Sequence, residues 1–231
     1  MHQLEFHGIT DTLKPEHAKY AKAFEVAAAV FRESEKLLNE EDLTKWSKGA
    51  QTADGDMVYS KSFPDGKYFA CQITGDLNID DLVNDAWNGV EKIPTWNQQI
   101  EYSSYVVKLS DNVDIIAYGN NGMATISARD FVVLRIRRRL PGGGWIIAQR
   151  SIQIPECPEK KGSVRANLHI TAASFVPHPK HPTTKTITTA ITRFELGGFI
   201  PSFLINQVMP KIIVTETELN KKHWKDVVAA K

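Results

Sequence analysis

The chain has 231 residues, of which 42% are hydrophobic and 24% charged, a composition typical of folded globular proteins rather than disordered or fibrous ones. Its 28 basic and 27 acidic residues nearly cancel, which excludes a strong positive field that would attract nucleic acid. Two cysteines without CxxC spacing argue against a disulfide scaffold or a zinc cluster, and favour a reducing compartment. We expect one cytoplasmic domain over residues 1–231, with no signal peptide and no membrane span.

Two helices and a hairpin are expected in the first part of the chain. Apolar residues at helical spacing predict a helix over 14–39. Two alternating segments joined by "PDGK" predict a β-hairpin over 56–74, because proline and glycine favour a tight turn there. A second helix is expected over 78–93, with Asn78 or Asp80 as its N-cap.

Strands dominate the chain from residue 99 to residue 195. Alternating segments are separated by "GNNG", "PGGG", "PECPEKKG" and "PHPKHP", which predicts an antiparallel meander. The last element is a strongly apolar helix after "LGG", with Pro201 in its first turn. Pro210 removes one helical hydrogen bond and predicts a kink near 206–210. The sequence thus indicates an α+β fold.

No catalytic or metal-binding constellation is visible in the sequence. It contains no GxxxxGK phosphate loop, no GxSxG nucleophile elbow and no HExxH pair. We therefore expect no enzymatic activity, no metal and no cofactor. A curved sheet against an apolar helix can enclose a cavity for a hydrophobic ligand, but periodicity alone also allows a solid core.

Three ordered motifs resemble the StAR-related lipid-transfer (START) family. They are "RDFVVLRIRRR" at 129–139, "SIQIPECPEKKGSVRA" at 151–166 and "ITRFELGGFIPSFLINQV" at 191–208. The "PTWN" stretch at 94–97 also matches the family pattern. The resemblance extends over most of the chain and is strongest with the sterol-handling branch.

The resemblance implies a helix-grip fold, in which a nine-stranded antiparallel sheet wraps around a long C-terminal helix and encloses a hydrophobic tunnel. Members bind one lipid and move it between membranes without a metal, usually as non-enzymes. We therefore expect a monomer that carries a sterol such as cholesterol, touches membranes transiently or is tethered there by other segments, and has no nucleic-acid partner. Two alternatives remain, a carotenoid carrier of the same fold and a regulatory module that senses lipid without transferring it.

The resemblance also assigns residues to the tunnel and its gate. The loop from Pro155 to Gly162, which contains Cys157 and Pro158, corresponds to the family's proposed gate together with the C-terminal helix. The residues expected to line the tunnel come from the arginine-rich strand and the last helix, and are Phe131, Val133, Ile205, Val208, Met209 and Ile212.

One buried charge is expected in the tunnel. The family places an arginine six residues after the start of "RDFV", which is Arg135 here, near an acidic residue of the preceding strand. That position falls on Ile116 when counted without gaps, and Asp114 lies on the same strand face two residues earlier. A buried guanidinium needs such a partner, so Asp114 is the candidate that would help Arg135 bind the lipid's polar group.

The alternation of the strand conflicts with this assignment. It places Val132, Leu134 and Ile136 on one face and Arg135 on the other, so the pattern alone would leave Arg135 in solvent. The resemblance reverses that expectation for Arg135. For the run Arg137–Arg139, exposure to solvent remains the expectation.

Overall fold

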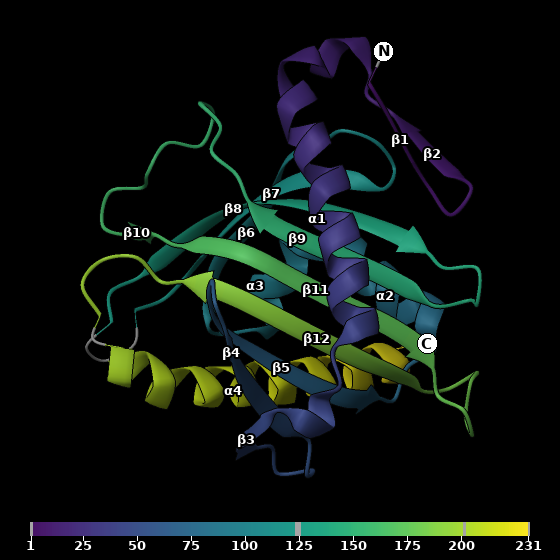
Figure 1. The fold of residues 1–231 in the computed structure, drawn as a ribbon, viewed down its shortest axis with the longest axis vertical. Coiled ribbons are helices and arrows are strands. Elements are labelled where there is room, and N and C mark those ends of the chain that lie inside the picture. The colour runs from purple at the N-terminus through teal and green to yellow at the C-terminus, as the bar shows by residue number, and fades with distance from the viewer. Residues whose placement is uncertain (1, 123–125, 201, 231) are drawn as a thin grey trace.

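Ten strands form one antiparallel sheet in a computed structural model that describes residues 2–122, 126–200 and 202–230 (Figure 1). Nine strands follow one another in the order β3-β4-β5-β12-β11-β9-β8-β7-β6, and the short β10 pairs in parallel with the start of β8. The strands are β3 (Ser47–Gln51), β4 (Met57–Phe63), β5 (Gly66–Gly75), β6 (Ile100–Lys108), β7 (Val113–Asn120), β8 (Arg129–Arg139), β9 (Trp145–Ser151), β10 (Val164–Arg165), β11 (Asn167–Pro177) and β12 (Thr186–Glu195).

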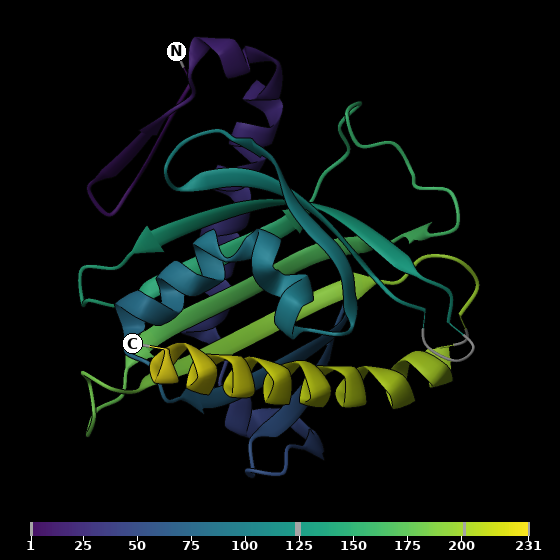
Figure 2. The same cartoon turned by 180° about the vertical axis from the view of Figure 1, so that it is seen from behind.

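Helices cover both faces of this sheet. The long helix α1 lies on one face, and α2, α3 and α4 lie on the other (Figures 1 and 2). Their bounds are α1 (Ala21–Glu40), α2 (Ile79–Asn88), α3 (Ile93–Trp96) and α4 (Ser202–Ala229), with short 3-10 turns at Pro15–Tyr20, Leu43–Lys45 and Val90–Lys92. The predicted α+β class, with an antiparallel sheet against a long C-terminal helix, is confirmed.

The two faces of the sheet are packed differently. On the α1 side, one continuous hydrophobic cluster joins Phe24, Phe31 and Val30 of the helix to alternate residues of the strands, such as Leu134 and Ile136. On the α4 side, three separate clusters occur instead, centred on Trp224, Phe131 and Met209. The side that holds α4 is therefore not a single solid core.

The last helix continues through Pro210 rather than ending there. Its C-terminal half packs against the sheet through Trp224. The Trp224 ring lies so close to Gly75 that a Cβ atom added to this glycine would be only 2.7 Å from the ring. Glycine at position 75 thus permits the helix to approach β5 closely. The helix is continuous over 206–210, and the kink expected there stays a prediction, while Pro201 lies outside the described residues.

Two departures from the expected elements have local causes. The helix expected over 78–93 ends at Asn88, because Gly89 is a poor helix former, and Pro94 lies in the first turn of the separate short helix α3, which begins at Ile93. An N-terminal hairpin of β1 (Gln3–Phe6) and β2 (Ile9–Thr12) was not predicted. Its turn uses His7 and Gly8, which both adopt positive φ, at 53° and 75°.

The predicted hairpin over 56–74 is confirmed as β4 and β5, and Asn78 is the N-cap of α2.

Within the described ranges, none of the helices combines the length and the apolar character needed to cross a bilayer. The same part of the chain contains no cluster of His, Cys, Asp and Glu side chains that could hold a metal ion.

Candidate functional site

Both faces of β8 are buried. Val132, Leu134 and Ile136 point toward α1, as the alternation predicts. Phe131 and Val133 belong to a cluster on the opposite face, the one that α4 covers. Alternation therefore assigns the faces correctly, but it does not identify a solvent face, because helices lie on both sides of the sheet.

Arg135 forms a bidentate ion pair with Asp114 on the α4 side of the sheet. Nε donates to Oδ1 at 2.8 Å and Nη2 donates to Oδ2 at 2.7 Å. The two residues are direct cross-strand neighbours on β8 and β7, whereas Ile116 lies opposite Val133. Arg135 is 4% exposed and Asp114 is 1% exposed, so this is a buried charge pair.

The remaining partners of Arg135 come from the end of α2. Nη1 donates to the carbonyl of Ala86 at 3.2 Å and Nη2 to that of Trp87 at 2.9 Å. These carbonyls are at the negative end of the helix dipole, which favours a cation. The guanidinium also lies 4.3 Å from the centre of the Trp87 ring. Four of its five N–H groups thus have acceptors in Asp114 and the α2 carbonyls, and the Tyr105 side chain also lies beside the guanidinium.

The expectation that Arg137–Arg139 face solvent is wrong for Arg138. This side chain is 0% exposed, on the α1 side of the sheet, and its Nη2 lies 2.5 Å from Oδ2 of Asp11 in β2. Period two already places residue 138 with Leu134 and Ile136, and the unpredicted N-terminal hairpin supplies the counter-charge. Arg139 is exposed as expected, and Arg137 is half-buried beside Trp87.

The residues expected to line the tunnel fall into two of the clusters on the α4 side. Phe131 and Val133 pack with Ile116 and Leu168. On α4, Met209 packs with Phe69, and its neighbours in the same cluster are Ile205 and Ile212. Val208 is half-buried. The structure therefore brings the predicted residues of β8 and α4 to the same side of the sheet, where they belong to two different hydrophobic clusters.

Several polar side chains lie deep in this interior yet retain accessible surface. Burial raises the pKa of the Cys71 thiol to about 11, and it also raises the pKa of Tyr118 and of Glu216. All three side chains are nevertheless only partly buried by accessible surface. Cys71, Tyr118 and Glu216 come from β5, β7 and α4, so the polar groups of this interior are supplied by both the sheet and the last helix.

The three motifs of the sequence meet at one end of the sheet. Arg129 donates from Nε to the carbonyl of Leu196 at 2.9 Å and from Nη2 to that of Gly197 at 3.1 Å. Its neighbour Asp130 accepts two hydrogen bonds from Arg165, at 2.9 and 2.7 Å. The "RDFV" strand therefore holds both the segment that leads into α4 and the end of the 155–162 loop.

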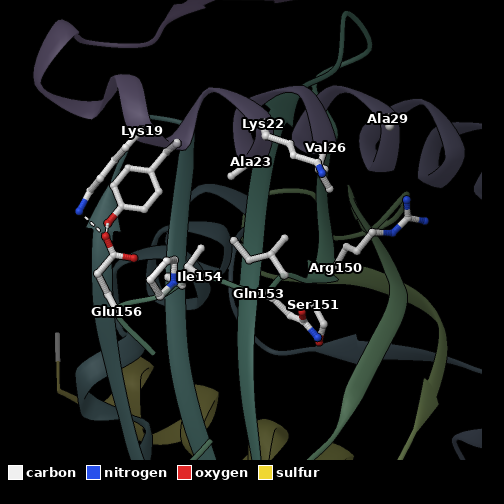
Figure 3. Close-up of a pocket in the computed structure, with 13 residues that line it drawn as sticks. Lys19, Lys22, Ala23, Val26, Ala29, Arg150, Ser151, Gln153, Ile154 and Glu156 are labelled. Atoms are coloured by element: carbon white, nitrogen blue, oxygen red, sulfur yellow. Dashed lines mark hydrogen bonds and ion pairs between the residues drawn. The ribbon is translucent and has the colours of Figure 1, made fainter. Parts of the chain in front are cut away.

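The 155–162 loop is largely exposed, and its first residues are held from two sides. Arg165 donates to the carbonyls of Cys157 and Pro158, at 3.3 and 3.0 Å. Gly162 has a φ of +91°, a conformation that favours glycine. Glu156, adjacent to Cys157, accepts hydrogen bonds from Lys19 and Tyr20, which precede α1, and Figure 3 shows it pointing toward Lys19.

A groove of about 680 Å³ lies between α1 and the segment 150–156, and Pro155 is among its lining residues (Figure 3). It is on the α1 side of the sheet, opposite the interior that Arg135 and α4 share. The groove therefore separates the base of the loop from α1 and does not open between the sheet and α4.

Sequence reasoning did not find Glu216, Tyr118 or the Arg138–Asp11 pair. A signal for Glu216 exists, because it follows Ile212 by four positions and Ile213 by three, which places it on the apolar face of the helix. An acidic residue on such a face is unusual. No comparable sequence signal points to Tyr118.

Comparison with known proteins agrees with this architecture. Residues 25–228 match the START domain family. The chain is 36% identical over 230 residues to "Steroidogenic acute regulatory-like protein 1" of Caenorhabditis elegans, covering 98% of this chain and 88% of the relative. It is 30% identical over 171 residues to "Steroidogenic acute regulatory protein, mitochondrial" of Salvelinus fontinalis. That match covers 73% of this chain and 59% of the relative's length.

Among solved structures, the fold is similar to that of "Human StAR-related lipid transfer protein 5". The TM-score is 0.76 at 19% identity, over 90% of this chain and 99% of the other. A likeness at this identity concerns the fold. Together with the match over residues 25–228 and the similarity to the nematode relative, it gives one conclusion: this chain belongs to the START domain family.

Proposed function

We propose that this protein binds one hydrophobic lipid between the sheet and α4 and transfers it between membranes, and that the lipid is a sterol. The observation that carries the proposal is the interior itself. Three separate apolar clusters line the region between the sheet and α4, which supports a hydrophobic ligand there. Burying a hydrocarbon there gains about 25 cal/mol per Å² of apolar surface, whereas a polar group mainly sets the ligand's direction.

Membership of the START family and the names of the relatives support this cargo. Within the proposal, Arg135 donates to the sterol oxygen, and Asp114 keeps the guanidinium in place. Residues Phe131, Val133, Ile205, Val208, Met209 and Ile212 contact the hydrocarbon. The loop of Pro155, Cys157, Pro158 and Gly162 opens with the N-terminal part of α4 to admit it.

Transfer between vesicles tests the proposal directly. Donor vesicles of phosphatidylcholine with a fluorescent sterol are mixed with unlabelled acceptors, with and without the purified protein. We expect the protein to accelerate sterol movement at least tenfold and to form a one-to-one complex with sterol in native mass spectrometry. Binding without accelerated transfer would instead support a lipid sensor, and preferential uptake of a yellow carotenoid would replace the sterol as cargo.

An exposed apolar pair marks the expected membrane contact. Phe199 is 99% exposed and Phe203 is 66% exposed. They are four residues apart, on the segment that enters α4 and its first turns, next to the carbonyls that Arg129 holds. Large side chains left in water at this place are suited to insertion into a bilayer surface.

Replacing Phe199 by aspartate is expected to slow vesicle transfer at least tenfold without changing the melting temperature. Each inserted phenylalanine gains about 2 kcal/mol or more from leaving water, and the side chain has no packing to lose in the free protein. Val228→Asp is the matched control, because Val228 is also exposed, at 47%, near the opposite end of α4. Equal loss of transfer in both variants would contradict a contact specific to Phe199.

A further inference from the structure

The interior contains a carboxyl group that has no charged partner. Glu216 of α4 accepts one hydrogen bond, at 2.8 Å, from the side-chain amide of Asn97 to its Oε2. No ion pair is formed by Glu216 within the described part of the chain, in contrast to Asp114 and its arginine. Within the described residues, its other carboxyl oxygen, Oε1, therefore keeps hydrogen-bonding capacity for another donor.

Asn97 fixes this carboxyl in place. Its Oδ1 accepts from the backbone N–H of Gln99 at 3.0 Å, which turns its amide nitrogen toward Glu216. Asn97 is 1% exposed and directly follows α3, so the donor cannot turn to solvent. The geometry of Glu216 is thus set by a rigid neighbour rather than by a flexible contact.

Two further polar groups lie on the sheet opposite α4. Asn97, which holds Glu216, accepts from the backbone N–H of Ile100 at 3.1 Å, so this carboxyl lies at the start of β6, the strand that pairs with β7 and Tyr118. The charge of Glu216 also raises the pKa of the Tyr118 phenol, a smaller effect than that of burial. Ser103 of β6 is the direct cross-strand neighbour of Tyr118, so both side chains are on the same face. Ser103 is 8% exposed, and its Oγ has no hydrogen-bond partner among the residues that the structure describes. A buried hydroxyl without a partner carries a free-energy cost that a bound polar group would remove.

We propose that Glu216, Tyr118 and Ser103 form a second polar subsite, which receives a hydroxyl group on the end of the bound lipid remote from Arg135. This inference rests on the proposed lipid-binding function. A hydroxyl can donate to Glu216 Oε1 and accept from the hydroxyl of Tyr118 or Ser103, so it satisfies both kinds of group.

The spacing of the two polar positions selects the ligand class. Asp114 and Tyr118 are four residues apart on the same face of β7, which corresponds to about 13 Å along a strand. Arg135 is a donor only, whereas the second subsite both donates and accepts. The interior is therefore suited to a rigid isoprenoid lipid with an oxygen function at each end, in preference to one with a single polar end.

Equilibrium binding of cholesterol and 25-hydroxycholesterol to the purified protein tests this subsite. The two sterols differ by one hydroxyl on the side chain. We expect the wild-type protein to bind the dihydroxylated sterol about 3- to 10-fold more tightly, the effect of one buried hydrogen bond. Glu216→Leu is expected to remove this preference while changing cholesterol affinity less than twofold.

Two variants separate the subsite from other causes. Glu216→Gln keeps a side chain that donates and accepts, so it should retain the preference. Asp226→Leu removes an exposed carboxylate of the same helix and should behave as the wild type. A preference that persists in Glu216→Leu overturns the subsite. Loss in Glu216→Gln also overturns it, because the charge and not the hydrogen bond would then be required.

Failure of sterol binding and failure of the subsite give different results. If the wild-type protein binds neither sterol, the sterol cargo is wrong. The subsite is then tested with a long-chain terminal diol against the alcohol of the same length that carries one hydroxyl. Equal affinity of the wild-type protein for these two probes overturns the subsite, and a preference for the diol that Glu216→Leu removes supports it.

Discussion

Replacing Asp114 by alanine is expected to lower the free energy of unfolding by about 3–5 kcal/mol, the usual cost of breaking a buried ion pair from one side. The variant leaves the guanidinium of Arg135, which is 4% exposed, without its carboxylate partner and next to the carbonyls of Ala86 and Trp87. Neither β7 nor β8 can move to expose it, because both are interior strands of the sheet. Urea-induced unfolding followed by tryptophan fluorescence measures the loss.

A double variant shows whether the unpaired charge is responsible. Asp114→Leu combined with Arg135→Met removes both charges and keeps similar volume, so it should recover most of the lost stability. Arg135→Met alone should be destabilising because it leaves Asp114 without its donors. A double variant no more stable than Asp114→Ala would contradict this account, and so would a loss below about 1 kcal/mol in Asp114→Ala itself.

Replacing Asp11 by alanine is expected to cost a similar amount, about 3–5 kcal/mol. Arg138 is 0% exposed, and Asp11 is its carboxylate partner, at 2.5 Å. Burial lowers the pKa of Arg138, which reflects the cost of holding this charge away from water. Asp11 belongs to a small hairpin near the N-terminus, so a large effect at this position would be surprising if the hairpin were only an appendage. Denaturant unfolding again provides the measurement.

The control for Asp11 lies on the same hairpin. Glu5 is an exposed acidic residue of β1, and Glu5→Ala should change stability by less than about 0.5 kcal/mol. Equal losses in Asp11→Ala and Glu5→Ala would indicate that the hairpin itself, rather than the ion pair with Arg138, accounts for the effect.

The fold could be predicted from sequence because its signals are local and ordered. Glycine- and proline-rich turns delimit the strands, and the spacing of three motifs identifies the helix-grip arrangement. The structure explains why those motifs are recognisable together: Arg129 and Asp130 hold the other two motifs by hydrogen bonds. The burial of Arg135 also followed from the family resemblance, although strand alternation argued against it.

The parts that escaped prediction depend on contacts between distant segments. Arg138 is 127 positions from Asp11 in the sequence, and no local sequence pattern near either residue predicts that they form an ion pair. A run of three arginines was interpreted as one solvent-facing unit, although a strand sends successive side chains to opposite faces. The register of Asp114 against Arg135 was likewise uncertain by two residues, since counting along a loop of unknown path does not determine strand pairing.

Pro210 has a consequence for how fast a bound molecule can leave. Proline supplies no N–H to the carbonyl four residues earlier, so the hydrogen-bond ladder of α4 is interrupted at that point. The turns before it can open without breaking those that follow, which Trp224 holds against β5. The residence time of the cargo would then be set by the local opening of residues 203–209. A variant could therefore release its cargo faster or slower with no change in its overall resistance to denaturation.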